Sequence, residues 1–258
     1  MADHEPGLRA ILLGASNLKA ALPTVLEGIR RKAAGPTEAL VACGHGRSYG
    51  TWSRFLFVRR LPGIAGCGLW RALEGRPPLR TLALITDVGN DLAYGAGVVE
   101  IAGWVEACLD RLAHHQAETV LTLLPLARLE KLSAWEVRLA ASLLFPGRPA
   151  PWPGLLERAQ ELDARLRRMG RERGAHLVEP EAAWYGRDPI HLHRRARPGV
   201  WDRVLSLWPT DPGAPGRSAA GRVRIPLLGT EELRLHGFIL RTPQPAVRLE
   251  DGTTVALY

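Results

Sequence analysis

Cysteine and long apolar runs are scarce in this sequence of 258 residues. The three cysteines, Cys43, Cys67 and Cys108, are far apart, which argues against a disulfide framework and against a paired metal motif. No apolar run approaches the roughly 20 residues that a membrane-spanning helix needs. The first residues, MADHEPGLR, lack a basic segment followed by an apolar one, so no secretory signal is expected. These absences favour a cytoplasmic protein with no membrane partner.

Lysine is also scarce, because Lys19, Lys32 and Lys131 are the only three in a chain with a formal net charge of +8. Almost all of the basic charge is therefore arginine. A basic protein can bind nucleic acid, but these arginines are scattered and no helix-turn-helix, zinc or RNA-binding motif accompanies them. We expect no nucleic-acid partner. The chain is 46% hydrophobic and 23% charged, which is an ordinary globular composition.

Five short runs rich in Val, Ile and Leu alternate with longer amphipathic segments. The runs are LRAILLG (8–14), EALVACG (38–44), RTLALITDVG (80–89), ETVLTLLPL (118–126) and AHLVEP (175–180). Their nearly continuous apolar character is typical of strands that are covered on both faces of a parallel sheet. The alternation predicts an α/β fold with three layers, a doubly wound parallel sheet of five strands between helices.

Composition divides the chain into three parts. Residues 1–208 form the α/β domain, with an insertion at 127–153 that is expected to pack on the sheet edge or to cap a site. Residues 209–222, rich in Pro, Gly and Ser, predict a linker. Residues 223–258 have two β-prone runs around Asp251-Gly252 and predict a small β-rich C-terminal appendage or strands added at a sheet edge.

Polar residues follow four of the predicted strands. They are Ser16 in GASN, the glycine-rich loop CGHGRSYG, then Asp87, Asn90 and Asp91 in TDVGNDLAYG, and finally Asp188 and His191 in DPIH. Ligands of open α/β sheets bind beyond the carboxyl ends of the strands, so these groups are expected at one edge.

Each of these residues has an ordinary structural explanation, since Ser16 can cap a helix and Asn90 can close a turn. A chemical explanation unites them. A serine hydroxyl becomes a nucleophile when a base removes its proton, and a histidine oriented by a carboxylate is the usual base. Asp188 and His191 are three residues apart, so one short loop can hold both. The amide of Asn90 can join backbone N–H groups in an oxyanion hole.

In this order and at these strand ends, the motifs resemble those of the SGNH (GDSL-like) family of serine esterases and lipases. The resemblance covers about residues 8–208 and implies a flavodoxin-like sheet with strand order 2-1-3-4-5. It implies a triad of Ser16, His191 and Asp188. It also implies hydrolysis of a small-molecule carboxylic ester, with no cofactor and no metal.

The resemblance extends to the oxyanion hole, which would combine Ser16, Gly46 and Asn90. Gly44 and Gly50 are alternatives to Gly46 as the glycine donor. Two positions depart from the family pattern. Ala15 stands where the first block usually has Asp, and Val88 stands where the third block usually has Gly. Neither departure removes a catalytic side chain, and both bear on substrate class and on the shape of the oxyanion hole.

Supporting roles fall to neighbours of these residues. Asp87 and Asp91 are expected to hydrogen-bond the loop that presents Asn90. His45, Arg47 and Tyr49 lie in the second loop and are candidates for lining the substrate pocket. The sequence makes no prediction of the oligomeric state.

Two other functions fit the same residues. A metal-dependent phosphoesterase would use carboxylates and imidazoles as ligands, from the set Asp87, Asp91, Asp188, His191 and His193, although no spacing matches a known metal cage. A binding module, including an inactive relative of the esterases, would hold an anion on the backbone N–H groups of GHGRSYG.

Overall fold

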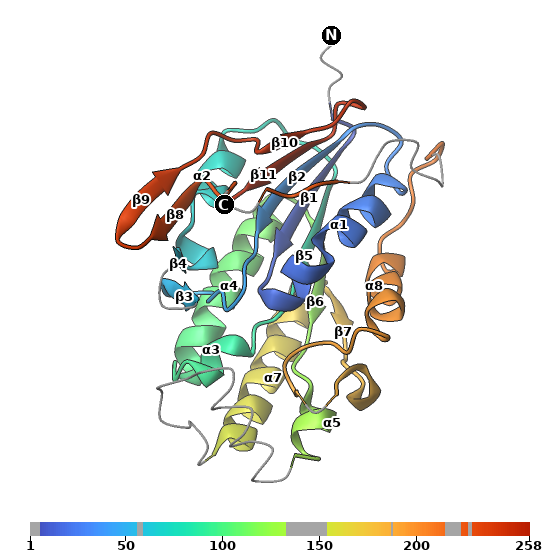
Figure 1. Cartoon of the computed structure of the whole chain (residues 1–258). Helices are drawn as coiled ribbons and strands as arrows, with labels where there is room; N and C mark the ends of the chain where they lie inside the picture. Colours follow the sequence, from blue (N-terminus) through green and yellow to red (C-terminus); the bar gives the residue numbers. More distant parts are fainter. Residues whose placement is uncertain (1–5, 56–58, 133–153, 187, 215–222, 227–228) are drawn as a thin grey trace.

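The computed structural model describes residues 6–55, 59–132, 154–186, 188–214, 223–226 and 229–258 (Figure 1). In this part of the chain, a seven-stranded sheet has the order β10-β11-β2-β1-β5-β6-β7. The strands are β1 (Leu8–Leu13), β2 (Thr37–Ala42), β5 (Thr81–Ile85), β6 (Glu118–Thr122), β7 (His176–Val178), β10 (Val247–Arg248) and β11 (Thr254–Leu257). The five strands expected from the sequence are parallel and lie in the order second, first, third, fourth, fifth. The predicted doubly wound α/β fold class is confirmed.

Helices cover both faces of the sheet because successive side chains of each strand point to opposite faces. The core on one face contains Leu8 and Leu12 of β1 together with residues of α1 and α8. The core on the other face contains Ile11 and Leu13 together with residues of α2, α4 and α7. These helices are α1 (Ser16–Arg30), α2 (Leu69–Glu74), α4 (Val98–His114), α7 (Leu155–Glu172) and α8 (Arg197–Ser206). Figure 1 shows the two helical layers on either side of the sheet.

The described residues also contain four short helical elements, η1 (Ile64–Gly66), α3 (Asn90–Ala93), α5 (Leu126–Leu129) and η2 (Ala182–Trp184). The insertion expected at 127–153 begins within α5, and its residues 133–153 lie outside the described residues. Among the helices that are described, none combines the length and the apolar character needed to cross a bilayer.

A second, antiparallel sheet lies beside the first, with the order β3-β4-β8-β9. It joins β3 (Ser53–Phe55) and β4 (Arg59–Leu61) to β8 (Glu232–Leu235) and β9 (Phe238–Arg241). Residues 223–258 therefore contribute to both sheets, because β11 pairs in parallel with β2 and β10 pairs with β11. These last two strands match the alternative of strands added at a sheet edge. The division into domain, linker and appendage stays a prediction.

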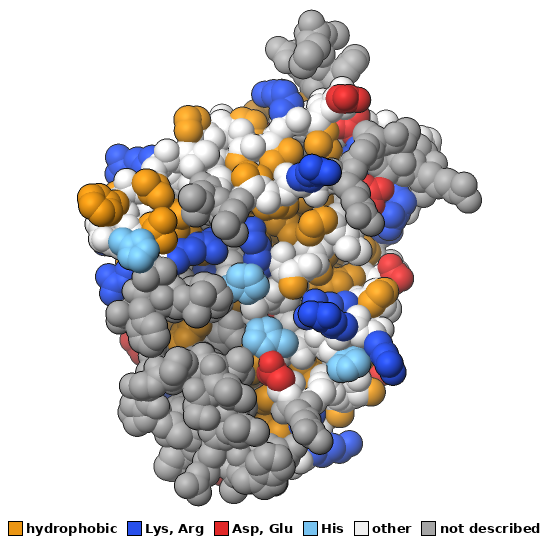
Figure 2. Space-filling view, viewed as in Figure 1, with side chains coloured by type: hydrophobic (Ala, Val, Ile, Leu, Met, Phe, Trp, Pro, Cys, Tyr) orange, Lys and Arg blue, Asp and Glu red, His pale blue; other side chains and the backbone are white. Residues whose placement is uncertain are grey.

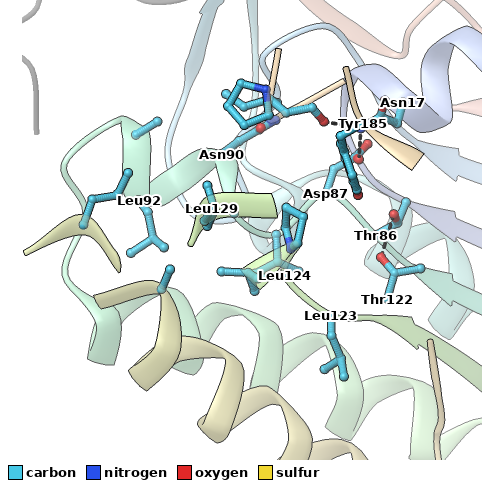
Figure 3. A pocket seen from close by; sticks show the side chains of 18 residues that line it. Asn17, Thr86, Asp87, Asn90, Leu92, Thr122, Leu123, Leu124, Leu129 and Tyr185 are labelled. Carbon is cyan, nitrogen blue, oxygen red and sulfur yellow. Dashed lines mark hydrogen bonds between the residues drawn. The ribbon is translucent and has the colours of Figure 1, made fainter. Parts of the chain in front are cut away.

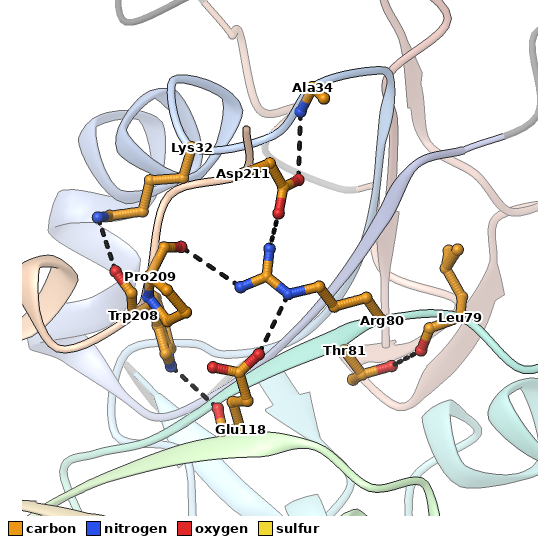
Figure 4. Close-up of polar contacts among 9 residues, drawn as sticks. All are labelled: Lys32, Ala34, Leu79, Arg80, Thr81, Glu118, Trp208, Pro209 and Asp211. Carbon is orange, nitrogen blue, oxygen red and sulfur yellow. Dashed lines mark hydrogen bonds and ion pairs between the residues drawn. The ribbon is translucent and has the colours of Figure 1, made fainter. Parts of the chain in front are cut away.

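The first residues of the predicted linker are bound to residues near the amino ends of β5 and β6 (Figure 4). The indole of Trp208 donates to the backbone oxygen of Glu118 at 2.9 Å. Arg80 forms ion pairs with Glu118 and with Asp211. The backbone N–H of Asp211 donates to the oxygen of Lys32 at 2.8 Å. These bonds hold residues 208–211 against the domain.

Candidate active site

The turn between β1 and α1 is held by a carboxylate from a neighbouring strand. Ala15 is the N-cap residue of α1 and offers no side-chain acceptor to the first N–H groups of the helix. Asp87 supplies one, because its Oδ2 accepts hydrogen bonds from the N–H groups of Ala15 at 2.8 Å and of Leu18 at 3.2 Å. Ser16 lies between these donors and is 5% exposed. The carboxylate of Asp87 thus supports the Ser16 turn, while its backbone oxygen accepts from the N–H of Asn90 at 3.5 Å.

Asn17 joins this turn to the loop that carries His191. Its Nδ2 donates to Asp87 Oδ1 at 2.9 Å and to the backbone oxygen of Ile190 at 3.0 Å. Its Oδ1 accepts from the N–H of Leu192 at 2.9 Å. The two backbone contacts flank His191 on either side, so the structure brings the loops of Ser16 and His191 together. Sequence reasoning missed Asn17, because a polar residue in the first turn of a helix carries no signal of so distant a partner.

Asp188 and His191 form a hydrogen-bonded pair. His191 Nδ1 lies 2.6 Å from Asp188 Oδ2, while Asp188 Oδ1 accepts from the N–H groups of Ile190 at 2.8 Å and of His191 at 3.2 Å. The hydrogen bond to Asp188 raises the pKa of His191, although burial opposes it. Burial would raise the pKa of Asp188, but the hydrogen bonds from His191 and Ile190 lower it overall. With Nδ1 turned to the carboxylate, Nε2 remains for proton transfer.

The loops after β2 and β5 are joined by Asp91. Its carboxylate accepts hydrogen bonds from Ser48 Oγ and from the N–H of Tyr49, the latter at 2.7 Å. Asp91 is 1% exposed, and burial raises its pKa. Asn90, the first residue of α3, precedes it in the chain and is also buried. Asp91 therefore holds the glycine-rich loop beside the helix that begins at Asn90.

Two features of the structure require a glycine at position 46. Its φ is +64°, and a Cβ at this position would lie 2.7 Å from the hydroxyl oxygen of Tyr94. The same hydroxyl donates to the backbone oxygen of Gly46 at 2.7 Å. At the alternative positions, Gly44 and Gly50, close packing explains the glycine. A Cβ at Gly44 would lie 2.4 Å from Leu61, and a Cβ at Gly50 would lie 1.9 Å from the Trp104 ring.

Arg47 and Tyr49 do not line a pocket, because both are 0% exposed. Arg47 donates to the backbone oxygens of Pro62, at 3.1 Å, and of Tyr258. The Tyr49 hydroxyl is 3.2 Å from the oxygen of Leu13 and 2.8 Å from that of Thr86. This corrects the expectation that the two side chains contact substrate. They support the loop from within.

The remaining imidazoles differ in their surroundings. His45 is half-buried, and burial, Arg59, Lys19 and His191 all lower its pKa. His193 is exposed. Across the ranges that the structure describes, no three His, Cys, Asp or Glu side chains are grouped so that they could hold a metal ion. Figure 2 shows imidazoles near the middle of one face, one of them beside a red carboxylate.

A cavity of about 100 Å³ lies beside Asp87 and Asn90, over β5 and β6 (Figure 3). Its polar end is formed by Asn17, Asp87 and Tyr185. Its larger part is apolar and is lined by Leu92, Leu123, Leu124, Leu129 and Leu155. Thr86 and Thr122 also line the cavity, and their hydroxyls are 2.8 Å apart and hydrogen-bonded to each other. The cavity can therefore take a small apolar group close to Asn90.

No protein-family model matches the sequence, and a search of curated proteins finds no match either. Solved structures do resemble the chain. The psychrotrophic esterase EstA from Pseudoalteromonas sp. is 14% identical, with a TM-score of 0.42 over 77% of this chain and 95% of its own. The carbohydrate acetylesterase Est24 from Sinorhizobium meliloti is 15% identical, with a TM-score of 0.47 over 78% and 100%. The aryl esterase of M. smegmatis is 15% identical, with a TM-score of 0.46 over 78% and 100%.

These identities and TM-scores are too low to establish an activity. The chain is a doubly wound α/β protein whose polar residues converge at the carboxyl ends of its strands.

Proposed function

We propose that this protein is a serine hydrolase that cleaves a carboxylic ester through a covalent acyl-enzyme. The observation that carries the proposal is the pair of hydrogen bonds between the Asn17 side chain and the backbone on both sides of His191, one donated to the oxygen of Ile190 and one accepted from the N–H of Leu192. These bonds hold the loop of His191 to Asn17, the residue next to Ser16. His191 is itself paired with Asp188. A candidate nucleophile, base and orienting carboxylate thus belong to one connected unit.

The reaction has two halves. Ser16 Oγ attacks the ester carbonyl while His191 Nε2 accepts its proton, and His191 then donates that proton to the departing alcohol. A water molecule, deprotonated by His191, attacks the acyl-enzyme, releases the carboxylic acid and restores Ser16. Asp188 fixes the orientation of the imidazole and stabilises its charged form through the 2.6 Å contact.

The developing oxyanion would be bound by the N–H groups of Ser16 and Gly46 and by the side chain of Asn90. The position of Ser16 at the N-terminus of α1 favours negative charge there. One such donor is typically worth about 3 kcal/mol of barrier.

The acyl part of the ester would enter the apolar cavity beside Asn90. A cavity of about 100 Å³ is smaller than the roughly 150 Å³ that accommodates benzene, so it fits a chain of about two to four carbons. Short-chain esters are therefore the expected substrates.

The test is a panel of para-nitrophenyl esters from acetate to decanoate, assayed on the wild type and on Ser16→Ala. We expect hydrolysis of the acetate and butyrate, and a loss of about a thousandfold or more in Ser16→Ala. A fluorophosphonate probe should label the wild type and not this variant. Ser206→Ala, which alters an exposed serine, is the matched control and should keep both the activity and the label.

Two outcomes would contradict the proposal. Folded wild-type protein that takes no label would favour the binding module. Hydrolysis that survives in Ser16→Ala and is abolished by a chelator would favour the metal-dependent phosphoesterase.

A further inference from the structure

The cavity proposed for the acyl group has two kinds of wall. One side carries three hydroxyl groups, those of Thr86, Thr122 and Tyr185, and the other side is rich in leucine (Figure 3). A purely apolar acyl chain would contact the leucines and leave the hydroxyls without a partner. The wall of hydroxyls is therefore a feature that the proposed function does not yet use.

The hydroxyls of Thr86 and Thr122 bond to each other and still have a hydrogen to donate. Two hydroxyls carry two hydrogens, and the 2.8 Å bond between them uses one. Within the described residues, neither side chain makes any other hydrogen bond. A Cβ at Gly14 would lie 2.6 Å from the methyl carbon of Thr86, so this methyl packs against the turn after β1 while the hydroxyl is turned to Thr122. The threonine pair thus offers one hydrogen and free lone pairs to a group in the cavity.

Tyr185 adds a third hydroxyl to the same wall. The side chain is half-buried, and its hydroxyl has no hydrogen-bond partner among the residues that the structure describes. Burial raises the pKa of Tyr185, and the negative charge of Asp87 raises it further. The phenol therefore stays protonated and can donate a hydrogen bond to a ligand.

We propose that the preferred ester has a hydroxyl on its acyl group, and that Thr86, Thr122 and Tyr185 bind this hydroxyl. The inference rests on the proposed function and names the substrate class, esters of short 2- or 3-hydroxy acids. A hydroxyl both donates and accepts, so it can accept the hydrogen left over from the threonine pair and donate to an oxygen of the same wall. The carbon atoms of the acyl chain would contact the leucines.

The experiment replaces the hydroxyl of the acyl group with a methyl group of similar size. The para-nitrophenyl ester of 3-hydroxybutyrate is compared with that of 3-methylbutyrate, and the ester of 2-hydroxypropanoate with that of 2-methylpropanoate. Each kcat/KM ratio is divided by the ratio of the alkaline hydrolysis rates, which removes the difference in intrinsic reactivity. We expect the wild type to favour the hydroxy ester about tenfold or more in at least one pair, because the methyl analogue leaves buried hydroxyls unpaired.

The double variant Thr86→Val, Thr122→Val tests the threonine pair. Valine keeps the shape of threonine, and replacing both partners together leaves neither hydroxyl unpaired, so the variant should fold. Its preference for the hydroxy ester should fall close to one. Tyr185→Phe should lower the preference about threefold or more. An unchanged preference in this variant would remove Tyr185 from the site.

Thr119→Val is the matched control. Thr119 lies in the same strand as Thr122 and is also buried, but its hydroxyl donates to the backbone oxygen of Ala117 at 3.2 Å and it does not line the cavity. The preference of this variant should equal that of the wild type. Thermal unfolding of each variant verifies that it is folded.

The outcomes separate this inference from the proposed function. A ratio near one in both pairs, in a wild type that hydrolyses the esters and is labelled at Ser16, would overturn the inference alone. So would a preference that persists in the double variant or is lost equally in Thr119→Val.

If the wild type hydrolyses no ester, the proposed function fails and binding decides the inference. Calorimetric titration of the wild type with the four free acids needs no catalysis. Tighter binding of a hydroxy acid than of its methyl analogue, lost in the double variant, would support the hydroxyl site. Equal affinities, or no binding of any of the acids, would overturn it.

Discussion

Asn17 donates a side-chain hydrogen bond to Asp87 at 2.9 Å, which links the turn after β1 to the turn after β5. Asp87 adopts a φ of +63°, a left-handed conformation that Asp and Asn tolerate better than most residues. From this position its carboxylate also accepts from the N–H groups of Ala15 and Leu18. The geometry of the Ser16 turn therefore depends on a residue 71 positions away in the chain.

Replacing Asn17 with Ala should lower kcat more than it raises KM. The substitution removes both hydrogen bonds that fasten the backbone around His191, and a misplacement of about 1 Å at a reacting group can cost a hundredfold. We expect kcat to fall about ten- to a hundredfold in steady-state hydrolysis of para-nitrophenyl acetate. Thr24→Ala, at an exposed position of the same helix, is the control and should have no effect. Equal losses in both variants would remove the positioning role from Asn17.

Replacing Asn90 with Ala tests the oxyanion hole. Loss of one donor should reduce kcat by about a hundredfold or more, equivalent to roughly 3 kcal/mol, while the protein stays folded. The measurement is single-turnover hydrolysis of para-nitrophenyl acetate, with far-ultraviolet circular dichroism as the check on folding. An unchanged rate in the folded variant would show that Asn90 has no part in stabilising the oxyanion.

The sheet was predictable from the sequence because its strands are apolar on both faces. The runs at 8–14 and 80–89 contain β1 and β5. The polar residues next to these runs could be located because they come directly after the predicted strand ends. The second sheet was not predicted, because β3 and β4 have three residues each and β4 pairs with β8, which is far away in sequence. Pairing between distant short strands leaves no local pattern.

Residue types at the site were easier to predict than their partners. The Asp188 and His191 pair is local, so its spacing alone indicated a contact, which the structure contains. Arg47 and Tyr49 looked like ligand groups because they are polar and lie in a glycine-rich loop. Their partners are backbone oxygens from other segments, such as Pro62 and Thr86, and only the folded chain brings these within reach.

Replacing Asp91 with Ala should destabilise the fold. The change leaves the N–H of Tyr49 and the hydroxyl of Ser48 without their acceptor in the interior, and hydrogen bonds to charged groups are worth about 1.5–3 kcal/mol each. We expect the free energy of unfolding, from urea denaturation, to fall by about 2–4 kcal/mol. Asp202→Ala removes an exposed carboxylate from α8 and should change it by less than about 0.5 kcal/mol. Equal stability of the two variants would contradict this role.

The pH dependence of hydrolysis should report the pair of Asp188 and His191. A base must be neutral to accept a proton, and the hydrogen bond to Asp188 raises the pKa of His191. Activity should therefore rise with pH through a midpoint above the usual value of about 6.5. The same shift means that the protonated imidazole stabilises the fold fully below its unfolded pKa, and that this contribution is lost as pH rises through the folded pKa.

Asp188→Asn tests the origin of that midpoint. The amide keeps a side chain of similar size but removes the negative charge that favours the protonated imidazole, so the pKa of His191 should fall. The kcat/KM profile should then reach its plateau at a lower pH, while the plateau itself drops by about a thousandfold or more because the imidazole is no longer held in the correct tautomer. A midpoint that does not move would mean that the rate reports another group, and His45, whose pKa is lowered by burial and by neighbouring cations, would be the next to replace.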